Sequence, residues 1–375
     1  MASSLYIGLI SGTSMDAIDC ALVDFRNRRP EQLDFITQDI PEDLRAKLLA
    51  LCEDHHGQIP LLGETDVEFA RELAHAVDRI LEKNDLKPSQ IAAIGSHGQT
   101  IRHLPTGNAP FTLQIGDPNT IAELSGITTV ADFRRRDMAA GGQGAPIVPA
   151  FHREIFSSAD NHRIVLNIGG MANITVLKKS GEIRGYDTGP GNVLMDTWIG
   201  EHQGHPYDRD GRWARSGTVI PALLEKFLSD PYFQLPAPKS TGRELFNATW
   251  LEKHLDGFAQ ETANADVQAT LMALTLESIS RDIRRELEKG EVIVCGGGAN
   301  NGYLMESLAE ALPAFRVMRS SSLGVLEDSV EAVAFAWLAQ QTLHQVPVNF
   351  TDITGSSHPV IAGGIYYAGK PVRQL

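Results

Sequence analysis

The chain has 375 residues, which at about 150 residues per domain predicts two to three domains. It carries 33 Lys and Arg against 47 Asp and Glu, and the resulting formal charge of −14 argues against a general nucleic-acid-binding or membrane-surface-binding protein. With 42% hydrophobic and 21% charged residues, the composition predicts a folded protein with a sizeable core. The three cysteines are scattered, no run of about 18 apolar residues occurs, and no basic segment follows Met1, so we expect a soluble, cytoplasmic protein.

Strands and helices alternate in the first part of the chain. The predicted elements are, in order, a strand over Leu5–Ile10, a polar turn over 11–16, a strand over Ile18–Phe25, helices over Pro41–Cys52 and Glu64–Asn84, and a short strand over Ile91–Gly95. The segment 132–146 combines glycines with charged residues, which predicts a functional loop or a domain connection rather than a regular element.

The strand–turn–strand pattern of the opening recurs in the second half of the chain. The predicted elements there are a strand over Arg163–Ile168, a turn at Gly169 and Gly170, a strand over Ile174–Leu177, a long helix over Thr262–Leu287, a buried strand over Glu291–Cys295 and a helix over Glu327–Gln341. One such strand–turn–strand unit in each half of the chain indicates an internal duplication.

We therefore predict an α/β protein with two lobes. The N-terminal lobe is expected over 1–134 and the C-terminal lobe over 135–353. The C-terminal tail, from about 354 to 375, is expected to pack back on the N-terminal lobe.

Three glycine-containing turns follow predicted strands and could bind a nucleotide. The turn 11–14, made of glycine and hydroxyl residues, lets backbone N–H groups converge on a phosphate, and Asp16 and Asp19 beside it could bind Mg²⁺ directly or through water. Gly169–Gly170 is a second turn of this kind. Gly296–Gly298 allows close approach of a flat ligand such as adenosine. Each turn alone could equally be an ordinary polar hairpin or a glycine-rich helix entry.

Asp187 lies between a predicted strand and a helix, in the sequence Tyr-Asp-Thr-Gly-Pro-Gly-Asn. A carboxylate on a rigid turn at the end of a strand is well placed for general-base chemistry. It could instead cap the next helix, although two glycines and a proline intervene. We favour the base, because phosphate-binding turns are predicted nearby.

Three further polar segments keep two interpretations each. His97 could be a structural histidine or a functional one, because no second metal ligand stands at a suitable spacing. The run Arg134–Arg136 could be a solvated face or could supply a guanidinium for a substrate carboxylate. The segment Lys239–Glu244 could be a plain loop or a polar lid over a sugar.

Eight segments, in order and covering nearly the whole chain, match one known family. They are Gly8–Asp16, Ser96–His103, Gln114–Asp117, Ala131–Arg134 with Gly141–Pro146, Asn167–Ile174, Asp187–Asn192, Val294–Gly298 and Glu327–Ala332. Through these segments the chain resembles the anhydro-N-acetylmuramic acid kinases, which are members of the actin- and hexokinase-like ATPases. The resemblance implies a duplicated RNase H-like fold with a central inter-domain cleft.

The resemblance also implies an activity. It predicts an ATP- and Mg²⁺-dependent kinase of peptidoglycan recycling, which hydrolytically opens 1,6-anhydro-N-acetylmuramic acid and phosphorylates O6. It further implies a homodimer whose partners are ATP and a small amino sugar. The alternatives are a kinase of another sugar and a non-enzymatic actin-like ATPase, although no separate peptide-binding domain is evident.

Matching the family's motifs assigns site residues. Asp187 becomes the catalytic base, while His97, Arg134 and Glu331 are assigned to the sugar. The implied nucleotide-binding residues are Gly12, Thr13, Ser14, Met15, Asp16, Ala17, Ile18, Asp19, Gly169, Gly170, Gly297 and Gly298. The family usually has glycine where this chain has Ala17, and alanine there would cost on the order of 1 kcal/mol if the position needed a positive φ.

Overall fold

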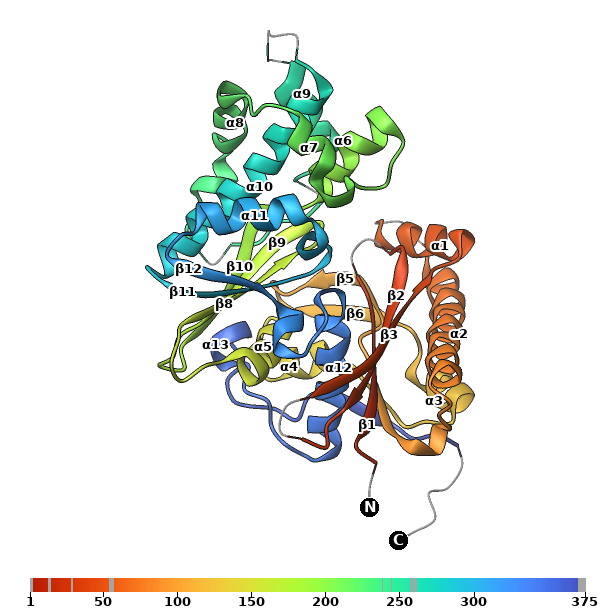
Figure 1. Cartoon of the computed structure of the whole chain (residues 1–375). Coiled ribbons are helices and arrows are strands. Elements are labelled where there is room, and N and C mark those ends of the chain that lie inside the picture. Colours follow the sequence, from red (N-terminus) through yellow and green to blue (C-terminus); the bar gives the residue numbers. More distant parts are fainter. Residues whose placement is uncertain are drawn as a thin grey trace. The chain divides into compact units, whose positions relative to one another are not determined.

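The computed structural model describes residues 3–12, 15–27, 30–53, 57–237, 239–243, 245–256, 258 and 262–369. The chain forms two compact units, of which unit 1 contains residues 1–155 and 329–375 and unit 2 contains residues 156–328. The lobes expected from the sequence, 1–134 and 135–353, divide the chain at other positions, and that division stays a prediction. Figure 1 traces the elements of both units.

Unit 1 contains a six-stranded sheet with the order β13-β7-β4-β1-β2-β3. Its strands are β1 (Leu5–Ser11), β2 (Ala17–Asp24), β3 (Glu31–Asp39), β4 (Ile91–Ser96), β7 (Thr129–Ala131) and β13 (Gly364–Tyr366). Strands β1, β2 and β3 form an antiparallel meander, and β4 runs parallel to β1. The almost uninterrupted burial of β1 follows from its apolar sequence and its central position, which exposes neither face.

Helices pack on both faces of this sheet. The remaining elements of unit 1 are α1 (Glu42–Cys52), α2 (Ile59–Lys83), α3 (Pro118–Ser125), α4 (Phe133–Ala139), α5 (Val148–Phe156), α12 (Val330–Leu343), α13 (Thr351–Thr354) and the hairpin β5 (Gln99–Leu104)–β6 (Phe111–Ile115). Helix α2 covers one face, where Ile7 and Leu9 of β1 join its apolar residues in the core. Helix α12 covers the other face (Figure 1).

Two glycines allow α12 to approach the sheet closely. A Cβ atom added to Gly8 of β1 would lie 1.8 Å from the carbonyl oxygen of Ala332, and one added to Gly95 of β4 would lie 2.0 Å from that of Phe335. No side chain fits in that space, so the glycines set how near the helix lies.

Unit 2 repeats the strand order of unit 1. Its five-stranded sheet has the order β10-β9-β8-β11-β12, made of β8 (Arg163–Ile168), β9 (Met171–Leu177), β10 (Ile183–Pro190), β11 (Gly290–Cys295) and β12 (Phe315–Arg319). As in unit 1, the first three strands form an antiparallel meander and the fourth runs parallel to the first. The predicted α/β class and the duplication of an RNase H-like sheet are therefore confirmed.

The helices of unit 2 are α6 (Val193–Gln203), α7 (Arg212–Ser216), α8 (Pro221–Leu228), α9 (Ala248–Asp256), α10 (Asn264–Glu286) and α11 (Gly302–Ala311). The amphipathic α10 packs against α6, α7, α8 and α11 and against β9 and β10 (Figure 1). Its buried side chains join those of the sheet in one core.

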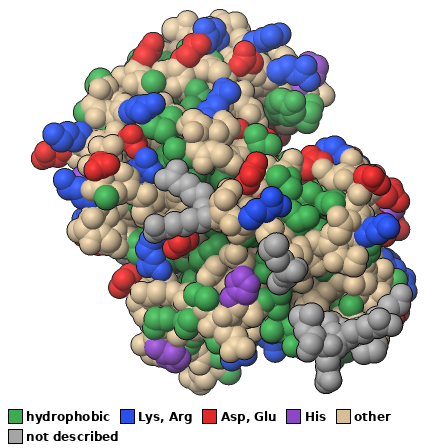
Figure 2. Space-filling model, turned by 60° about the horizontal axis from the view of Figure 1, so that its bottom comes forward, with side chains coloured by type: hydrophobic (Ala, Val, Ile, Leu, Met, Phe, Trp, Pro, Cys, Tyr) green, Lys and Arg blue, Asp and Glu red, His purple; other side chains and the backbone are tan. Residues whose placement is uncertain are grey.

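Most elements predicted from apolar patterns agree with the structure, but one predicted loop is a helix and several short strands and helices were not predicted. Residues 133–139, predicted to be a loop, form helix α4. Strand β3 was not predicted, because it is an edge strand whose residues are mostly exposed or half-buried and show no apolar run. None of the helices in the described ranges combines the length and the apolar character needed to cross a bilayer. On the face shown in Figure 2, acidic and basic side chains are interspersed.

Candidate active site

Asp187 lies in β10, close to its carboxyl end, and the loop over residues 239–243 holds it on two sides. Its backbone N–H donates to the carbonyl of Lys239 at 3.0 Å. Its carboxylate oxygen Oδ2 accepts hydrogen bonds from the hydroxyl of Ser240 and the N–H of Thr241, both at 3.0 Å. In addition, the hydroxyl of Tyr232 donates to the Asp187 carbonyl at 2.7 Å. These contacts fix both the main chain and the carboxylate, as general-base chemistry requires.

The alternative role for Asp187, capping the next helix, is not realised. Helix α6 begins at Val193, and Asn192 occupies its N-cap position. The first N–H of the helix, that of Val193, donates to the carbonyl of Gly170 at 3.1 Å. The Asp187 side chain is thus directed to the 239–243 loop rather than to α6.

The second turn is compact and internally bonded. The N–H of Gly169 donates to the carbonyl of Met171 at 3.1 Å, so it is engaged within the hairpin. A Cβ on Gly170 would lie 4.0 Å from a guanidinium nitrogen of Arg243, which brings a cation from the 239–243 loop next to this turn. The turn that was predicted to bind a phosphate therefore lies in the same unit as Asp187, with an arginine beside it.

The first turn joins β1 and β2 in unit 1. Of the predicted residues here, Thr13 and Ser14 lie outside the described part of the chain. Apart from its chain neighbours, no described residue places a heavy atom within 4 Å of where a Cβ on Gly12 would be. The side chains of Met15 and Ile18 are buried in the core of unit 1, so only their main chain could face a ligand.

The two predicted metal-binding carboxylates of this turn differ in environment. Asp16 is exposed, and its carbonyl accepts a hydrogen bond from the N–H of Ile40 at 2.9 Å. Asp19 is half-buried and accepts a hydrogen bond from the hydroxyl of Thr37 at 3.0 Å. Ala17 begins strand β2, paired with Asp39, so its backbone is extended and does not need glycine. Met15 of this turn has a positive φ of 54°.

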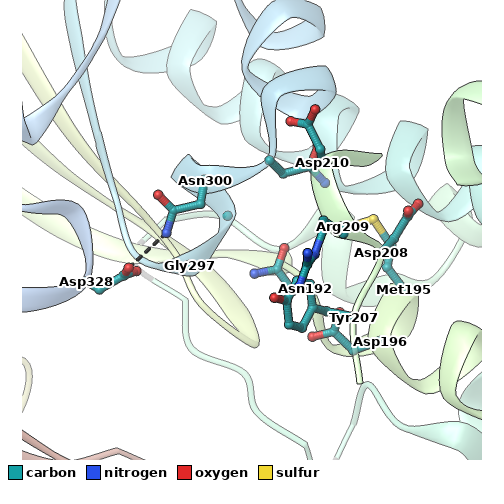
Figure 3. A pocket seen from close by; sticks show the side chains of 12 residues that line it. Asn192, Met195, Asp196, Tyr207, Asp208, Arg209, Asp210, Gly297, Asn300 and Asp328 are labelled. Atoms are coloured by element: carbon teal, nitrogen blue, oxygen red, sulfur yellow. Dashed lines mark hydrogen bonds between the residues drawn. The ribbon is translucent and has the colours of Figure 1, made fainter. Parts of the chain in front are cut away.

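The third turn, at Gly297 and Gly298, lines a cavity of about 580 Å³ within unit 2. Its other lining residues are Asn192, Met195, Asp196, Tyr207, Asp208, Arg209, Asp210, Asn300, Asn301 and Asp328. Figure 3 shows Asn300 and Asp328 joined by a hydrogen bond, 2.8 Å long, near Gly297, while Arg209, Tyr207 and Asn192 lie apart from them on another wall. The volume is typical of small-molecule sites.

The chemistry of this cavity suits a nucleoside better than a polyphosphate. Four of its lining residues are aspartates and only Arg209 is a cation, so uncharged hydroxyl and amino donors are favoured over anions. Burial raises the pKa of Asp196 to about 7, with Arg243 opposing and Asp208 adding to the shift. A Cβ on Gly297 would meet no protein atom within 4 Å, so a flat ring can approach the backbone there.

The three predicted sugar-binding residues form one cluster in unit 1. Arg134 Nε–H donates to His97 Nε2 at 2.9 Å, and His97 Nδ1–H donates to the carbonyl of Gly98 at 2.9 Å. The imidazole is therefore neutral, and burial together with Arg134 lowers its pKa to about 3. Glu331, whose side chain remains solvent-accessible at the start of α12, interacts electrostatically with Arg134.

Arg134 is held by more than His97. Its Nη1–H donates to the carbonyl of Gly144 at 3.0 Å. Burial lowers the pKa of Arg134 to about 10, while the charges of Glu331 and Asp137 act in the opposite direction. Asp137 is fully buried and accepts hydrogen bonds from the N–H of Gly144 and the hydroxyl of Thr354, both at 2.7 Å. The cation stays charged at neutral pH, which a site for a carboxylate requires.

Sequence reasoning missed several residues of these sites. Most lining residues of the cavity come from the segment 207–210 and from the start of α6, which carry no recognisable pattern. Asn300 and Asn301 could have been found, because they directly follow the Gly296–Gly298 turn. Within the described ranges, no group of three or more His, Cys, Asp or Glu side chains could hold a metal ion by itself. A cation at Asp16 and Asp19 would need further ligands from a phosphate.

The chain matches the family model described as anhydro-N-acetylmuramic acid kinase over residues 4–368. The chain belongs to this family. Curated relatives with that name include proteins from Shewanella denitrificans, 50% identical over 97% of this chain and 98% of the relative, and from Saccharophagus degradans, 49% identical over 98% and 100%. A third, from Photobacterium profundum, is 48% identical over 98% and 100%. The family that the eight motifs predicted is thereby confirmed.

Among solved structures, the activator of the 2-hydroxyisocaproyl-CoA dehydratase from Clostridium difficile with bound ADPNP aligns with 91% of this chain and 98% of its own, at 12% sequence identity and a TM-score of 0.46.

Proposed function

We propose that this protein is an ATP-dependent kinase that opens the internal glycosidic bond of 1,6-anhydro-N-acetylmuramic acid with water and phosphorylates O6. The product is N-acetylmuramic acid 6-phosphate, and the reaction serves peptidoglycan recycling. Membership of the kinase family supports the substrate and the reaction class. The observation that carries the chemistry is the single carboxylate of Asp187, oriented by the 239–243 loop in the unit that also holds two of the glycine turns.

In the proposed reaction Asp187 acts on water. Its carboxylate accepts a proton from a water molecule whose oxygen bonds to C1 of the sugar, and the C1–O6 bond breaks. O6 bonds to the γ-phosphorus of ATP, and ADP leaves with the electrons of the broken P–O bond. Phosphoryl transfer thus takes over stabilisation of the leaving oxygen, which most glycosidases achieve with a second, acidic carboxylate.

The nucleotide would be held by the glycine turns. We propose that the cavity at Gly297 and Gly298 takes the adenosine and that the turns at Gly12 and at Gly169–Gly170 face the phosphates. The open space over Gly12 and Gly297 fits close approach of a ligand to the backbone. Mg²⁺, held by Asp16 and Asp19 directly or through water, would neutralise phosphate charge.

The sugar would be recognised by the cluster in unit 1. We propose that Arg134 pairs with the lactyl carboxylate, since a guanidinium held at two positions is preorganised for a carboxylate. His97, kept neutral, orients Arg134, and Glu331 accepts a hydrogen bond from the N-acetyl group. We also propose a cytoplasmic homodimer, as the family resemblance implies, which sedimentation analysis would test.

The decisive experiment uses ¹⁸O-labelled water. The protein is incubated with ATP, Mg²⁺ and the anhydro sugar, and the product is analysed by mass spectrometry and NMR. We expect one ¹⁸O atom at C1 together with phosphate on O6. Phosphate on a sugar that is still a closed anhydro ring would refute the coupled mechanism.

Two rival functions are separated in the same assay. A kinase for another sugar would phosphorylate glucose, N-acetylglucosamine or free N-acetylmuramic acid faster than the anhydro sugar. A non-enzymatic ATPase would release phosphate at the same rate with and without any sugar. We expect ATP turnover to depend on the anhydro sugar.

A further inference from the structure

A buried ion pair fixes the loop that contacts Asp187. Lys239 Nζ lies 3.2 Å from a carboxylate oxygen of Asp282 on α10, and each of the two side chains is only 4% exposed. The ammonium also lies 4.8 Å from the centre of the Tyr232 ring. Removing two charges from water is costly, so a buried pair is weak evidence for stability, whereas breaking it leaves an uncompensated buried charge. The pair therefore attaches the first residue of the loop to a long core helix.

The same few residues reach the base. The carbonyl of Lys239 accepts the N–H of Asp187, and the next two residues, Ser240 and Thr241, donate to its carboxylate. Tyr232, whose ring lies over the ammonium, donates its hydroxyl to the Asp187 carbonyl. The three contacts from residues 239–241 depend on where the backbone of Lys239 lies.

We propose that Lys239 is a positioning residue, which through its ion pair with Asp282 holds the 239–241 backbone so that Asp187 points its carboxylate in a productive direction. The inference rests on the proposed function, because it takes Asp187 as the base. Lys239 is buried, whereas Ser240 and Arg243 of the same segment are exposed.

The first test replaces the ammonium. In Lys239→Met we expect kcat to fall about 10- to 100-fold, because a misplaced catalytic group costs about that much, while KM for ATP and for the sugar stay within about threefold. The acid limb of the pH–kcat profile should move to higher pH, because the ionised carboxylate loses two donors. Lys239→Arg, which keeps the charge, should recover most of the rate.

The second test separates positioning from stability. Lys239→Met leaves Asp282 buried with less compensation, whereas the double variant Lys239→Met/Asp282→Asn removes both charges. Arg285, which bonds Asp282 at 3.0 Å, is 54% exposed and can be solvated. We expect the double variant to melt near the wild-type temperature but to keep the low kcat and the shifted pH profile. The matched control is Lys178→Met, which breaks the surface pair with Glu182 in the same unit. It should change neither kcat nor the pH profile.

The outcomes distinguish this inference from the proposed function. A double variant with wild-type kcat and pH profile overturns the positioning role. If Asp187→Asn retains the full rate, the assignment of the base fails, whatever Lys239 does. If Asp187→Asn is inactive and the double variant is fully active, the proposed function stands and only this inference is refuted.

Discussion

The two sheets share a strand order but contact their helices differently. In each unit the first strand pairs in parallel with the fourth: β1 with β4 in unit 1, and β8 with β11 in unit 2. At the next-to-last paired position, Gly8 lies beside Gly95 in unit 1, whereas Leu166 lies beside Val294 in unit 2. The glycines admit α12 to the backbone of unit 1, while the apolar side chains of unit 2 fill a conventional core. The two units therefore share a topology, while the residues at equivalent strand positions determine how closely a helix can pack on each sheet.

The close approach in unit 1 has a functional consequence. Helix α12 carries Glu331 at its start and Phe335 one turn later, and the Phe335 ring lies 4.7 Å from that of His97 at the end of β4. His97 in turn contacts Arg134. The glycines therefore set how near α12 lies to the proposed sugar cluster, whereas in unit 2 loop contacts hold Asp187, the proposed base.

The largest expected effect tests this division between a chemical site and a binding site. Asp187→Asn in unit 2 should lower kcat about 10²- to 10⁴-fold with little change in KM, because only the base is lost. Arg134→Met in unit 1 should mainly raise KM for the sugar, since a carboxylate loses its partner. Steady-state kinetics with both substrates measures this. Equal effects of both variants on kcat alone would break the comparison.

The second effect concerns packing. Gly8→Ala should destabilise the protein by about 1–3 kcal/mol or more, because the new methyl group collides with a helix carbonyl. Leu166→Ala should cost about 2–5 kcal/mol for the opposite reason, a cavity. Gly12→Ala is the control, since its Cβ meets nothing within 4 Å. Denaturant unfolding measures all three, and a Gly8→Ala protein as stable as Gly12→Ala would contradict the close approach.

The sequence predicted the duplication but not these contacts. Strands and the turns beside them are local patterns of apolar and small residues, so the central strands of both sheets and the turns at Gly12, Gly169 and Gly297 could be found. The tight contact at Gly8 depends on a helix more than 300 residues away in the chain. The ion pair of Lys239 with Asp282 likewise joins a loop to a helix, and nothing local marks either residue as buried.

The third effect is a pH dependence of stability, which has opposite signs for one group in each unit. The pKa of His97 in unit 1 is lowered from 6.5 to about 3, so the folded state binds its proton less readily and stability falls as pH drops through this range. The pKa of Asp196 in unit 2 is raised from 3.8 to about 7, so the folded state holds a proton that the unfolded chain releases. Stability from this group therefore falls as pH rises from about 4 to 7.

At about 1.4 kcal/mol for each pKa unit, the contribution of each group to stability should change by up to about 4–5 kcal/mol across its range. Denaturant unfolding at pH 4, 6 and 8 measures them. Asp196→Asn should remove the loss of stability as pH rises, and His97→Gln should reduce the loss of stability as pH falls. His152 of unit 1, whose pKa burial also lowers to about 3, retains part of the acid sensitivity. An unchanged pH profile in Asp196→Asn would show that its carboxyl group ionises normally in the folded protein.

The smallest effect concerns Ala17, where the family usually has glycine. Because Ala17 lies in extended backbone paired with Asp39, Ala17→Gly should only lower stability, by about 0.5–1 kcal/mol, and leave KM for ATP within twofold. Ala21→Gly, at a fully buried position of the same strand, should cost more because a packed methyl group is also lost. A gain in ATP affinity with Ala17→Gly would mean that alanine strains the first turn. In that case the first glycine turn, between β1 and β2, would differ from the second, at Gly169–Gly170, in backbone strain as well as in sequence.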